Sequence, residues 1–350
     1  MAVDLLARQM AAKALNGGGG DDDNAVVYAG GHDSVIQNVT SIPGESTVRT
    51  NEVNDITNFG TVLGERNHLG YTTDDNWSAY TADSTHGSNG TAVTGGANII
   101  SQTEDSFIFG YKNRTYAAHQ SIVGGYKSKV YASESAVFGE RHTVNGTLYE
   151  ENGDIKTNTR RLLVYGSGHT VSEGVQDSFI GGRNNTAGSY MHFSVVNGQG
   201  NTIGNNCEWI QVFGGGDGYG NIINNNVADS SVFGWSNTIY GGADSSHRTS
   251  NNYVMGHDNT VENPSKSGRG LDRVYLFGRY LRPAHSEHFV LGAYNGSVNE
   301  EFDVLSIGCG TDANNRSDCF GTGINGNSKY IRIGDTLLTE AQLQSLLNLI

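Results

Sequence analysis

Between residues 60 and 310 the sequence repeats one short phrase: a hydrophobic triplet, a glycine, and then often an asparagine followed by a β-branched residue. The clearest copies are SFIFGYKNRT, SVVNGQGNTI, SVFGWSNTI and YVMGHDNTV. A fixed short period of this kind is typical of a solenoid, in which each unit packs only on its neighbours. Where the copies are regular, their glycines lie 14 to 16 residues apart, in the runs Gly110, Gly125, Gly139; Gly166, Gly182, Gly198, Gly214; and Gly278, Gly292, Gly308.

Each repeat predicts two short strands joined by tight turns. Side chains alternate between two faces in a segment such as 135–139, and the second half of the unit supplies a β-branched residue that suits a pleated sheet. The glycine fits a corner that needs a positive φ or the close approach of a neighbouring backbone. The asparagine three residues later tolerates the left-handed region and bonds to nearby backbone, so we expect it to form the next corner.

A unit of about 15 residues cannot bury its apolar face alone, so we expect stacked units that pair edge to edge around one continuous core. A solenoid with two short strands in each turn is thin and leaves apolar surface exposed, which predicts lateral association into an oligomer. The predicted fold class is all-β: a parallel β-roll or β-solenoid, with a short helix near each end of the chain.

The repeated phrase S-h-h-h-G-x-x-N-T-[IV], where h is hydrophobic, resembles the head repeats of trimeric autotransporter adhesins of the YadA type. The resemblance covers residues 60–310. It implies a left-handed parallel β-roll in each chain, three rolls packed about a threefold axis, and a role in adhesion. The matching residues build the scaffold, so the resemblance does not identify a ligand.

Composition excludes several other classes of protein. Glycine is abundant at 49 residues and proline scarce at 3, and glycine does not recur at every third position, so the chain is not a collagen. A net charge of −14 makes the phosphate backbone of nucleic acid a poor partner.

Three cysteines, Cys207, Cys309 and Cys319, show no CxxC spacing. A disulfide between Cys309 and Cys319 across one turn is conceivable, but free buried thiols are the favoured interpretation.

The first 16 residues predict an amphipathic helix. Its apolar stripe consists of Val3, Leu6, Met10 and Ala14. Residues 17–24 are rich in Gly and Asp and read as a flexible hinge, and residues 25–59 as an adaptor of short strands that leads into the repeats. A helix this short is marginal alone, so we expect it to dock either on its symmetry mates or on a larger assembly, such as a tail, neck or capsid protein of a virion. A disordered tail is the alternative.

Residues 311–350 predict a C-terminal cap that ends in a second amphipathic helix. Thr339 and Gln342 have the spacing of a capping box. One apolar stripe follows, made of Leu343, Leu346, Leu347 and Ile350. Three such helices could pin a trimer at its tip. The ending KYIRIGDTLLTEAQLQSLLNLI also resembles the C-termini of phage and prophage tail-fibre proteins, over about 22 residues.

The ends of the chain lead us to expect a virion protein rather than a bacterial surface adhesin. The first residues do not read as a secretory signal, and the last do not read as the membrane-anchoring strands of an autotransporter. No run of 18 apolar residues predicts a membrane-spanning helix, so no membrane insertion is expected. The expected location is the virion, with assembly in the host cytoplasm.

The sequence gives little indication of catalysis. The eleven histidines are scattered, and His142 and His169 stand in the asparagine position of the repeat, where a polar corner residue is a better interpretation than a metal ligand. The acidic residues at 150–154 fall in an insertion and suit the tip of a hairpin better than the paired carboxylates of a glycosidase. We therefore expect no enzyme activity, no catalytic residues and no metal or other cofactor.

Insertions interrupt the period at about residues 70–92, 143–160, 240–251 and 262–272. In solenoids such insertions form loops on one face, which is often the binding face. The first insertion contains Tyr71, Trp77 and Tyr80 beside two aspartates, a combination that suits stacking on sugar rings or packing against a neighbouring protomer.

These observations predict a non-enzymatic homotrimeric fibre or spike of a bacteriophage, which attaches to a host surface, with a glycan as a candidate receptor. Three alternatives are a decoration fibre on the capsid or neck with weak adhesion, a bacterial trimeric adhesin passenger, and, as the weakest, a polysaccharide depolymerase.

Overall fold

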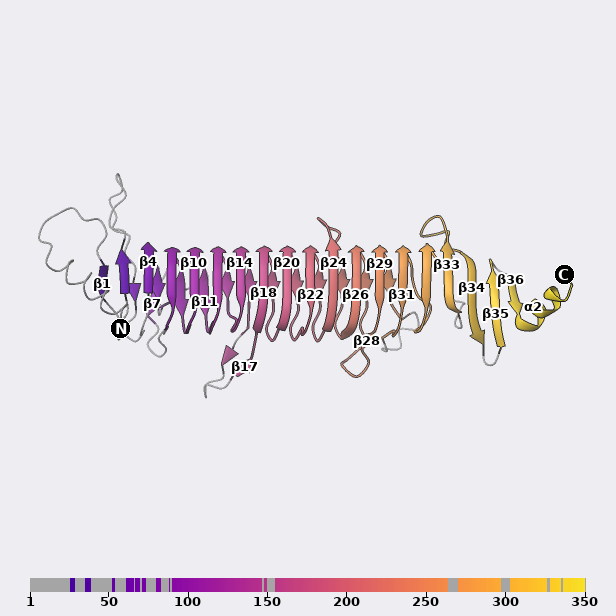
Figure 1. The fold of residues 1–350 in the computed structure, drawn as a ribbon, viewed down its shortest axis with the longest axis horizontal. Helices are drawn as coiled ribbons and strands as arrows, with labels where there is room; N and C mark the ends of the chain where they lie inside the picture. Colours follow the sequence, from indigo (N-terminus) through magenta and orange to yellow (C-terminus); the bar gives the residue numbers. More distant parts are fainter. Residues whose placement is uncertain are drawn as a thin grey trace, which may run out of the picture. The chain divides into compact units, whose positions relative to one another are not determined.

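The computed structural model describes residues 90–146, 148–149, 155–263, 270–296, 303–325, 328–334 and 336–349, and before them 26–28, 35–38, 52–53, 61–65, 67–69, 71–73, 80–82 and 88. These residues are nearly all β, forming a β-solenoid of about 12 turns and one short C-terminal helix (Figure 1). The all-β solenoid predicted from the repeat is confirmed. The chain divides into two compact units, residues 1–176 and 177–350.

In the first unit, each regular turn holds one long strand and one short return strand. The long strands pair in parallel in the order β4 (Thr61–Glu65), β8 (Ala92–Gly96), β10 (Phe107–Tyr111), β12 (Ile122–Tyr126), β14 (Ala136–Glu140) and β18 (Arg160–Ser167). The return strands form a second parallel ladder of β3 (Glu52–Val53), β5 (His68–Leu69), β9 (Ile99–Ser101), β11 (Arg114–Tyr116), β13 (Lys129–Val130), β15 (Thr143–Val144) and β19 (Thr170–Val171).

Other strands of the first unit lie outside this plan. β1 (Val26–Tyr28) pairs antiparallel with β2 (Val35–Asn38), which pairs in parallel with β4. Two insertions form antiparallel hairpins: β6 (Tyr71–Thr73) with β7 (Tyr80–Ala82), and β16 (Leu148–Tyr149) with β17 (Ile155–Thr157). The hairpin predicted within insertion 143–160 is confirmed, whereas its acidic residues 150–154 lie outside the described residues.

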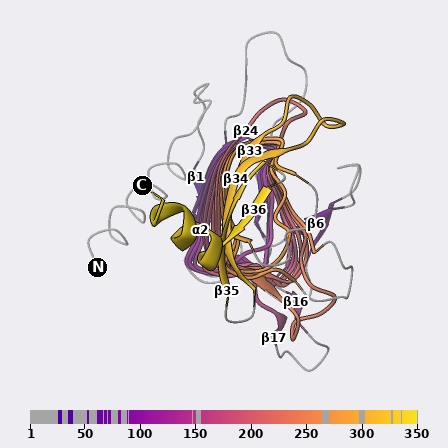
Figure 2. The ribbon, with the colours of Figure 1, turned by 90° about the vertical axis from the view of Figure 1, so that its right-hand side faces the viewer.

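The second unit repeats the same plan. Its long strands pair in parallel in the order β20 (Gln176–Arg183), β22 (Val195–Gln199), β24 (Glu208–Gly215), β26 (Val227–Trp235), β29 (Tyr253–His257), β31 (Tyr275–Arg279), β32 (Phe289–Ala293) and β33 (Asp303–Cys309). Its return strands are β21 (Thr186–Ala187), β23 (Thr202–Ile203), β25 (Ile222–Ile223), β27 (Thr238–Ile239) and β30 (Thr260–Val261). β28 (Thr249–Ser250) pairs with the start of β26. In the end view of Figure 2 the long strands of this unit overlie one another.

The phrase glycines stack directly on one another and explain why the repeat needs glycine at that position. Gly110 pairs with Gly125, and Gly234 with Gly256. Gly234 has a φ of 116°, and a Cβ added there would lie 1.8 Å from the carbonyl oxygen of Gly256. Both reasons predicted from the sequence, a positive φ and a close backbone approach, are therefore confirmed.

The core lies between the two ladders of each unit. The middle residue of each hydrophobic triplet points inward, as does the second residue of most return strands, and both classes are almost fully buried. Because side chains on a strand alternate, the first and third triplet residues point outward. The apolar residues of the inward column are Val62, Val93, Ile108, Val123, Val137 and Val164 in the first unit and Ile180, Val196, Val212, Val232, Val254, Leu276 and Val290 in the second.

The asparagine of the repeat does not adopt the left-handed conformation predicted for it. The residue before it does: Lys112, Ser236 and Asp258 have φ values of 58°, 55° and 57°. Asn113 instead points inward, fully buried, and its amide donates to the carbonyls of Phe109 and Gly125. The asparagine thus satisfies backbone groups inside the corner, and the left-handed turn falls one residue earlier.

The C-terminal end of the second unit departs from the parallel plan. β33 pairs antiparallel with β34 (Asp318–Asn325), which pairs with β35 (Ser328–Ile333), followed by β36 (Thr336–Thr339). Helix α2 (Glu340–Leu347) begins at Thr339, whose hydroxyl accepts from the Gln342 N–H while the Gln342 side chain accepts from the Thr339 N–H. The predicted helix and its capping box are therefore confirmed.

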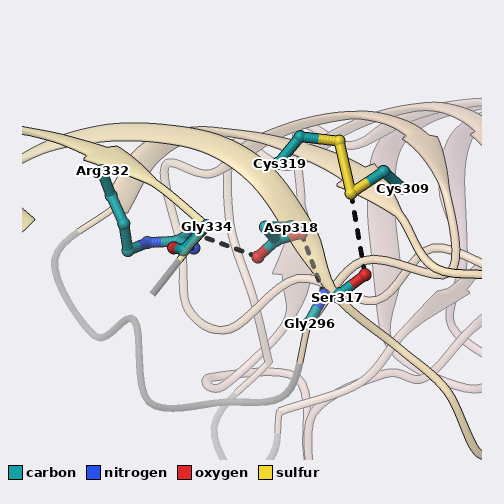
Figure 3. Close-up of a disulfide and its surroundings, with 7 residues drawn as sticks. All are labelled: Gly296, Cys309, Ser317, Asp318, Cys319, Arg332 and Gly334. Atoms are coloured by element: carbon teal, nitrogen blue, oxygen red, sulfur yellow. Dashed lines mark hydrogen bonds and ion pairs between the residues drawn. A yellow bond between two sulfur atoms is a disulfide. The ribbon is translucent and has the colours of Figure 1, made fainter. Parts of the chain in front are cut away.

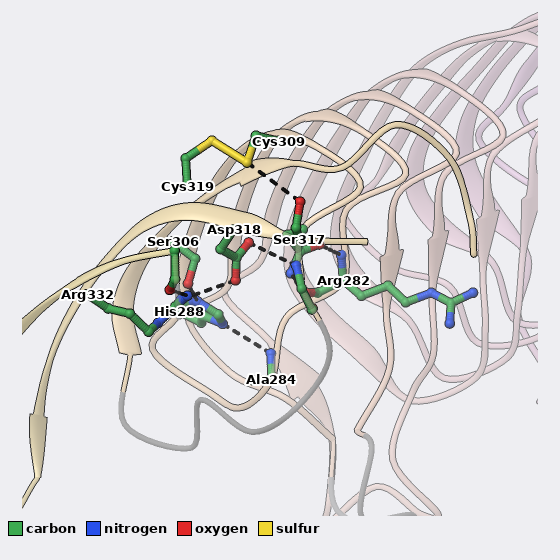
Figure 4. Close-up of polar contacts among 12 residues, drawn as sticks. Arg282, Ala284, His288, Ser306, Cys309, Ser317, Asp318, Cys319 and Arg332 are labelled. Carbon is green, nitrogen blue, oxygen red and sulfur yellow. Dashed lines mark hydrogen bonds and ion pairs between the residues drawn. A yellow bond between two sulfur atoms is a disulfide. The ribbon is translucent and has the colours of Figure 1, made fainter. Parts of the chain in front are cut away.

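Polar contacts hold the base of this cap. The buried carboxylate of Asp318 accepts a hydrogen bond from the Gly296 N–H at 2.9 Å and pairs with Arg332 at 3.2 Å (Figure 3). One turn earlier, the buried ring of His288 accepts from the Ala284 N–H and contacts the Ser306 hydroxyl at 2.9 Å (Figure 4). Together these contacts bridge β33, β34, β35 and the loop before β32.

The prediction of free buried thiols is wrong for two of the three cysteines. Cys309 and Cys319 form a disulfide, and both residues are exposed (Figure 3). The physical reason is the antiparallel return of β34 on β33, which brings their Cα atoms to 5.7 Å, within the range of a disulfide. Cys207 is a free buried thiol as predicted, and burial raises its pKa to about 11.

Candidate functional site

Buried polar side chains form a ladder at the corner between long and return strands. In the second unit, the side-chain oxygen of each asparagine accepts the backbone N–H of the next, and its amide donates to the glycine carbonyl of the next turn. The members of this ladder are Asn185, Asn201, Asn221, Asn237 and Asn259. These side chains are structural, because their hydrogen-bonding groups are used within the scaffold.

Two histidines replace asparagine in the first unit. His142 Nε2 and His169 Nε2 lie 3.0 Å from the carbonyl oxygens of Phe138 and Tyr165, so each must donate from that nitrogen. The His169 N–H donates to His142 Nδ1, which makes His142 the neutral Nε2–H tautomer. Burial is the main cause that lowers its pKa to about 4. The interpretation of both histidines as polar corner residues is confirmed.

Within the residues that the structure describes, no group of three or more His, Cys, Asp or Glu side chains is placed to hold a metal ion. A candidate surface of a different kind lies on the outward face of the long strands, where many exposed side chains are apolar. We call this surface the apolar face and define it by the first and third triplet residues.

In the first unit the apolar face is made of exposed aromatic and aliphatic side chains on β10–β18. Phe107, Ile122 and Leu163 are 43%, 44% and 41% exposed. The ring of Phe109 contacts the rings of Phe107 and Phe138, with centroids 5.4 and 6.2 Å apart. It lies over Gly124, where an added Cβ would be 2.1 Å from its Cζ atom.

In the second unit the apolar face follows β24–β32. The rings of Phe213, Phe233, Tyr253 and Phe277 contact one another in sequence, with centroids 5.4 to 5.5 Å apart. Phe289 extends this series through contacts with Tyr275 and Phe277. Polar residues Gln211 and Ser231 occupy two of the first positions. Contiguous apolar patches on the surface of a folded chain are candidate interaction surfaces.

The structure gives a partial account of the predicted receptor loop. Tyr71 and Tyr80 lie on the paired strands β6 and β7, where Thr73 is opposite Tyr80 and Tyr71 is opposite Ala82. Trp77 lies outside the described residues. The backbone therefore places the two tyrosines on one hairpin, and their role as receptor contacts stays a prediction.

The two predicted helices have different outcomes. The proposed attachment residues Val3, Leu6, Met10 and Ala14 all lie outside the described residues. In α2, Leu346 and Leu347 are 49% and 63% exposed, and no residue of the helix is buried. Leu343 is half-buried, and Ile350 lies outside the described residues. Within one chain the leucine stripe of α2 is thus available for contact with other chains.

Sequence reasoning missed a set of exposed aromatic residues at the corners that lead into the long strands of the second unit. Phe193 and Trp209 stack at this corner with ring centroids 4.6 Å apart. The signal in the sequence is an aromatic residue two positions before the triplet, where neighbouring repeats have polar residues such as Asp229 and Asn251.

No helix among the described residues is long and apolar enough to span a membrane. No known protein family matches the sequence, and comparison with curated proteins finds no relative.

Proposed function

We propose that this chain forms the shaft of a homotrimeric bacteriophage fibre that attaches the particle to a host cell surface. The observation that carries the proposal is the apolar face of the long strands. The buried asparagine side chains form hydrogen bonds within the scaffold, and the outer face of the long strands is apolar. Both features suit a structural fibre.

Association through the apolar face removes aromatic surface from water; full burial of an exposed Phe side chain contributes about 1.5–3 kcal/mol, and burial of a ring that is already half-buried contributes less. A second copy of the chain is the partner that the repeat itself suggests, because matching turns present rings at the same spacing of about 4.8 Å. The number of copies comes from the resemblance to the head repeats of trimeric adhesins, which pack three rolls about one axis.

The assignment to a virion rests on the ends of the chain. The exposed leucines of α2 and the capping box at Thr339 belong to the segment that resembles phage fibre C-termini. In this proposal three copies of α2 close a small bundle at the tip, and residues 1–16 bind a tail, neck or capsid protein. The protein assembles in the host cytoplasm, and the exposed Cys309–Cys319 disulfide forms after release into an oxidising medium.

The virion assignment is tested by removing residues 1–16. The truncated protein should keep the oligomeric mass of the full chain but should be missing from purified particles, as judged by mass spectrometry of the particle proteins. Equal incorporation of the truncated and full-length chains would show that another segment attaches the fibre. Absence of the full-length protein from particles would contradict the virion assignment itself.

A further inference from the structure

The corners that lead into the long strands of the second unit form one column of left-handed residues. The residues just before each corner are paired in register, from His192 with Glu208 through Ala228 and Ser250 to Asp272. The corner residues themselves have φ values from 46° to 63°. They are therefore spaced by about one strand separation, 4.8 Å, in the order Asp177, Phe193, Trp209, Asp229, Asn251, Arg273 and Glu287.

Phe193 and Trp209 are the two aromatic residues of this column, whose other members are charged or polar. Asp and Asn tolerate a positive φ because their short polar side chains bond locally, whereas a bulky aromatic residue in this region is strained. Trp209 has a φ of 56° and Phe193 a φ of 50°. Both rings are exposed, at 56% and 46%, so they do not offset the strain by filling the core. The left-handed conformation recurs at every corner of the column, so the two exposed rings, rather than the backbone, distinguish this position.

The two rings are stacked on each other, which fixes the direction of the face left open. Their centroids are 4.6 Å apart and their planes differ by 15°. The stack therefore runs along the column, and the face of Trp209 turned away from Phe193 looks toward the next two corners. Those corners carry Asp229 and Asn251, whose side chains are short and exposed, so neither corner adds an aromatic ring to the stack.

Charged groups lie on the segments next to Trp209 in the chain and in the neighbouring turn. Arg248, in the insertion at 240–251, reaches back to Glu208, the residue before Trp209, with Nη1 and Oε2 3.0 Å apart. Hydrogen bonding from Arg248 lowers the pKa of the Glu208 carboxyl, which stays ionised. Asp229 lies close enough to Arg248 to raise the pKa of the guanidinium, although Glu208 is the main cause. The segments next to Trp209 thus supply carboxylates and a guanidinium, and the corner after Asp229 supplies the amide of Asn251.

We propose that Trp209 is the platform of a saccharide-binding site, on which a pyranose ring continues the Phe193–Trp209 stack. The apolar C–H face of the sugar packs on the indole, and its hydroxyls donate to the Asp229 carboxylate and bond to the Asn251 amide. A nucleobase would also stack there, but the carboxylates and the net charge of −14 disfavour a phosphate backbone. The inference rests on the attachment role proposed above and names its ligand class as a neutral oligosaccharide.

The test uses the full-length protein on a printed array of bacterial and animal oligosaccharides, followed by calorimetric titration of the strongest neutral binder. Trp209→Ala and Asp229→Ala should each weaken binding at least about tenfold, as expected for loss of a stacking face or a charged hydrogen bond. Trp209→Phe should retain most of the affinity because it keeps an aromatic face. Trp235→Ala is the matched control, since Trp235 is a similarly exposed indole at another corner. The Trp235→Ala variant should bind the saccharide with the affinity of the wild type.

The proposal is overturned if no saccharide on the array binds, or if Trp209→Ala binds as tightly as the wild type. It is also overturned if Trp209→Ala changes the oligomeric mass, because the platform would then be a contact between copies. A protein that binds no saccharide but still adsorbs to host cells would remove this site and leave the fibre proposal intact.

Discussion

The long strands and the return strands both present one face outward, yet the two faces differ in chemistry. In the second unit the return strands place threonine outward in four of five turns, Thr186, Thr202, Thr238 and Thr260, with Ile222 as the exception. The long strands place Phe, Tyr, Met and Leu outward from β24 to β32. Both faces belong to the same turns and point away from the core, so the folding of one chain does not require the long strands to carry aromatic residues where the return strands carry threonine. The return face suits water, and the apolar face suits another protein surface.

The largest effect is expected from charges on the apolar face. The double variant Phe233→Asp/Phe277→Asp should dissociate the oligomer to the chain mass of 37.4 kDa, because two carboxylates would be buried without partners. Light scattering after gel filtration measures this mass. The matched control Thr202→Asp/Thr238→Asp, on the return face, should keep the oligomer. If both double variants dissociate, or if both keep the oligomeric mass, the apolar face is not the surface that holds the copies together.

A second variant tests the corner that joins the two faces. Asn237 donates to the Gly256 carbonyl at 2.8 Å and accepts from the Asn259 N–H at 3.1 Å, and all three groups are within the scaffold. Asn237→Ala should lower the free energy of unfolding by about 1–3 kcal/mol for each buried group left unsatisfied. Denaturant unfolding measures the loss, and Asn314→Ala, at an exposed site, serves as the control. A loss below that of the control would mean that the ladder is not structural.

The third prediction concerns pH and the corner of the first unit. His142 is neutral in the fold with a pKa of about 4, below its ordinary value of 6.5, so the unfolded state binds the proton more readily. Its contribution to stability is complete above pH 6.5 and is lost as the pH falls from 6.5 toward 4. His142→Asn, which restores the common ladder residue, should lose less melting temperature between pH 7.5 and 5 than the wild type. Equal losses would exclude His142 as a source of acid sensitivity.

The smallest effect on the scaffold is expected at the β6–β7 hairpin. Trp77→Ala/Tyr80→Ala should leave the melting temperature unchanged and weaken binding to host cells if these residues contact the receptor. Cell adsorption and thermal unfolding measured on the same preparation check both parts. Unchanged adsorption would exclude this hairpin as a receptor site and leave Trp209 as the candidate.

The sequence predicts the solenoid well because its period fixes three things at once: strand register, the inward column and the stacked glycines. Gly110 shows this, since its positive φ of 104° and its contact with Gly125 follow from the spacing alone. The spacing predicts a corner near Asn113 but not which residue is left-handed, because a left-handed turn at Lys112 satisfies the same spacing. The disulfide at Cys309 was missed because pairing depends on the antiparallel return of β34, which breaks the repeat.

The Trp209 site was harder to predict for a different reason. The corner residues share a left-handed backbone conformation but no common residue type, since Asp, Phe, Trp, Asn, Arg and Glu all occur there. No hydrophobic period therefore marks Phe193 and Trp209 as neighbours. Only the paired register of β24 and the bridge from His192 to Glu208 place the two rings in one column.

The central claim is that the apolar face is covered by other copies of the chain. Multi-angle light scattering of the full-length protein tests it most directly. We expect a mass of about 112 kDa, three times the chain mass of 37.4 kDa, at all micromolar concentrations. A concentration-independent mass near 37.4 kDa would contradict the account, because the apolar face would then be stable in water.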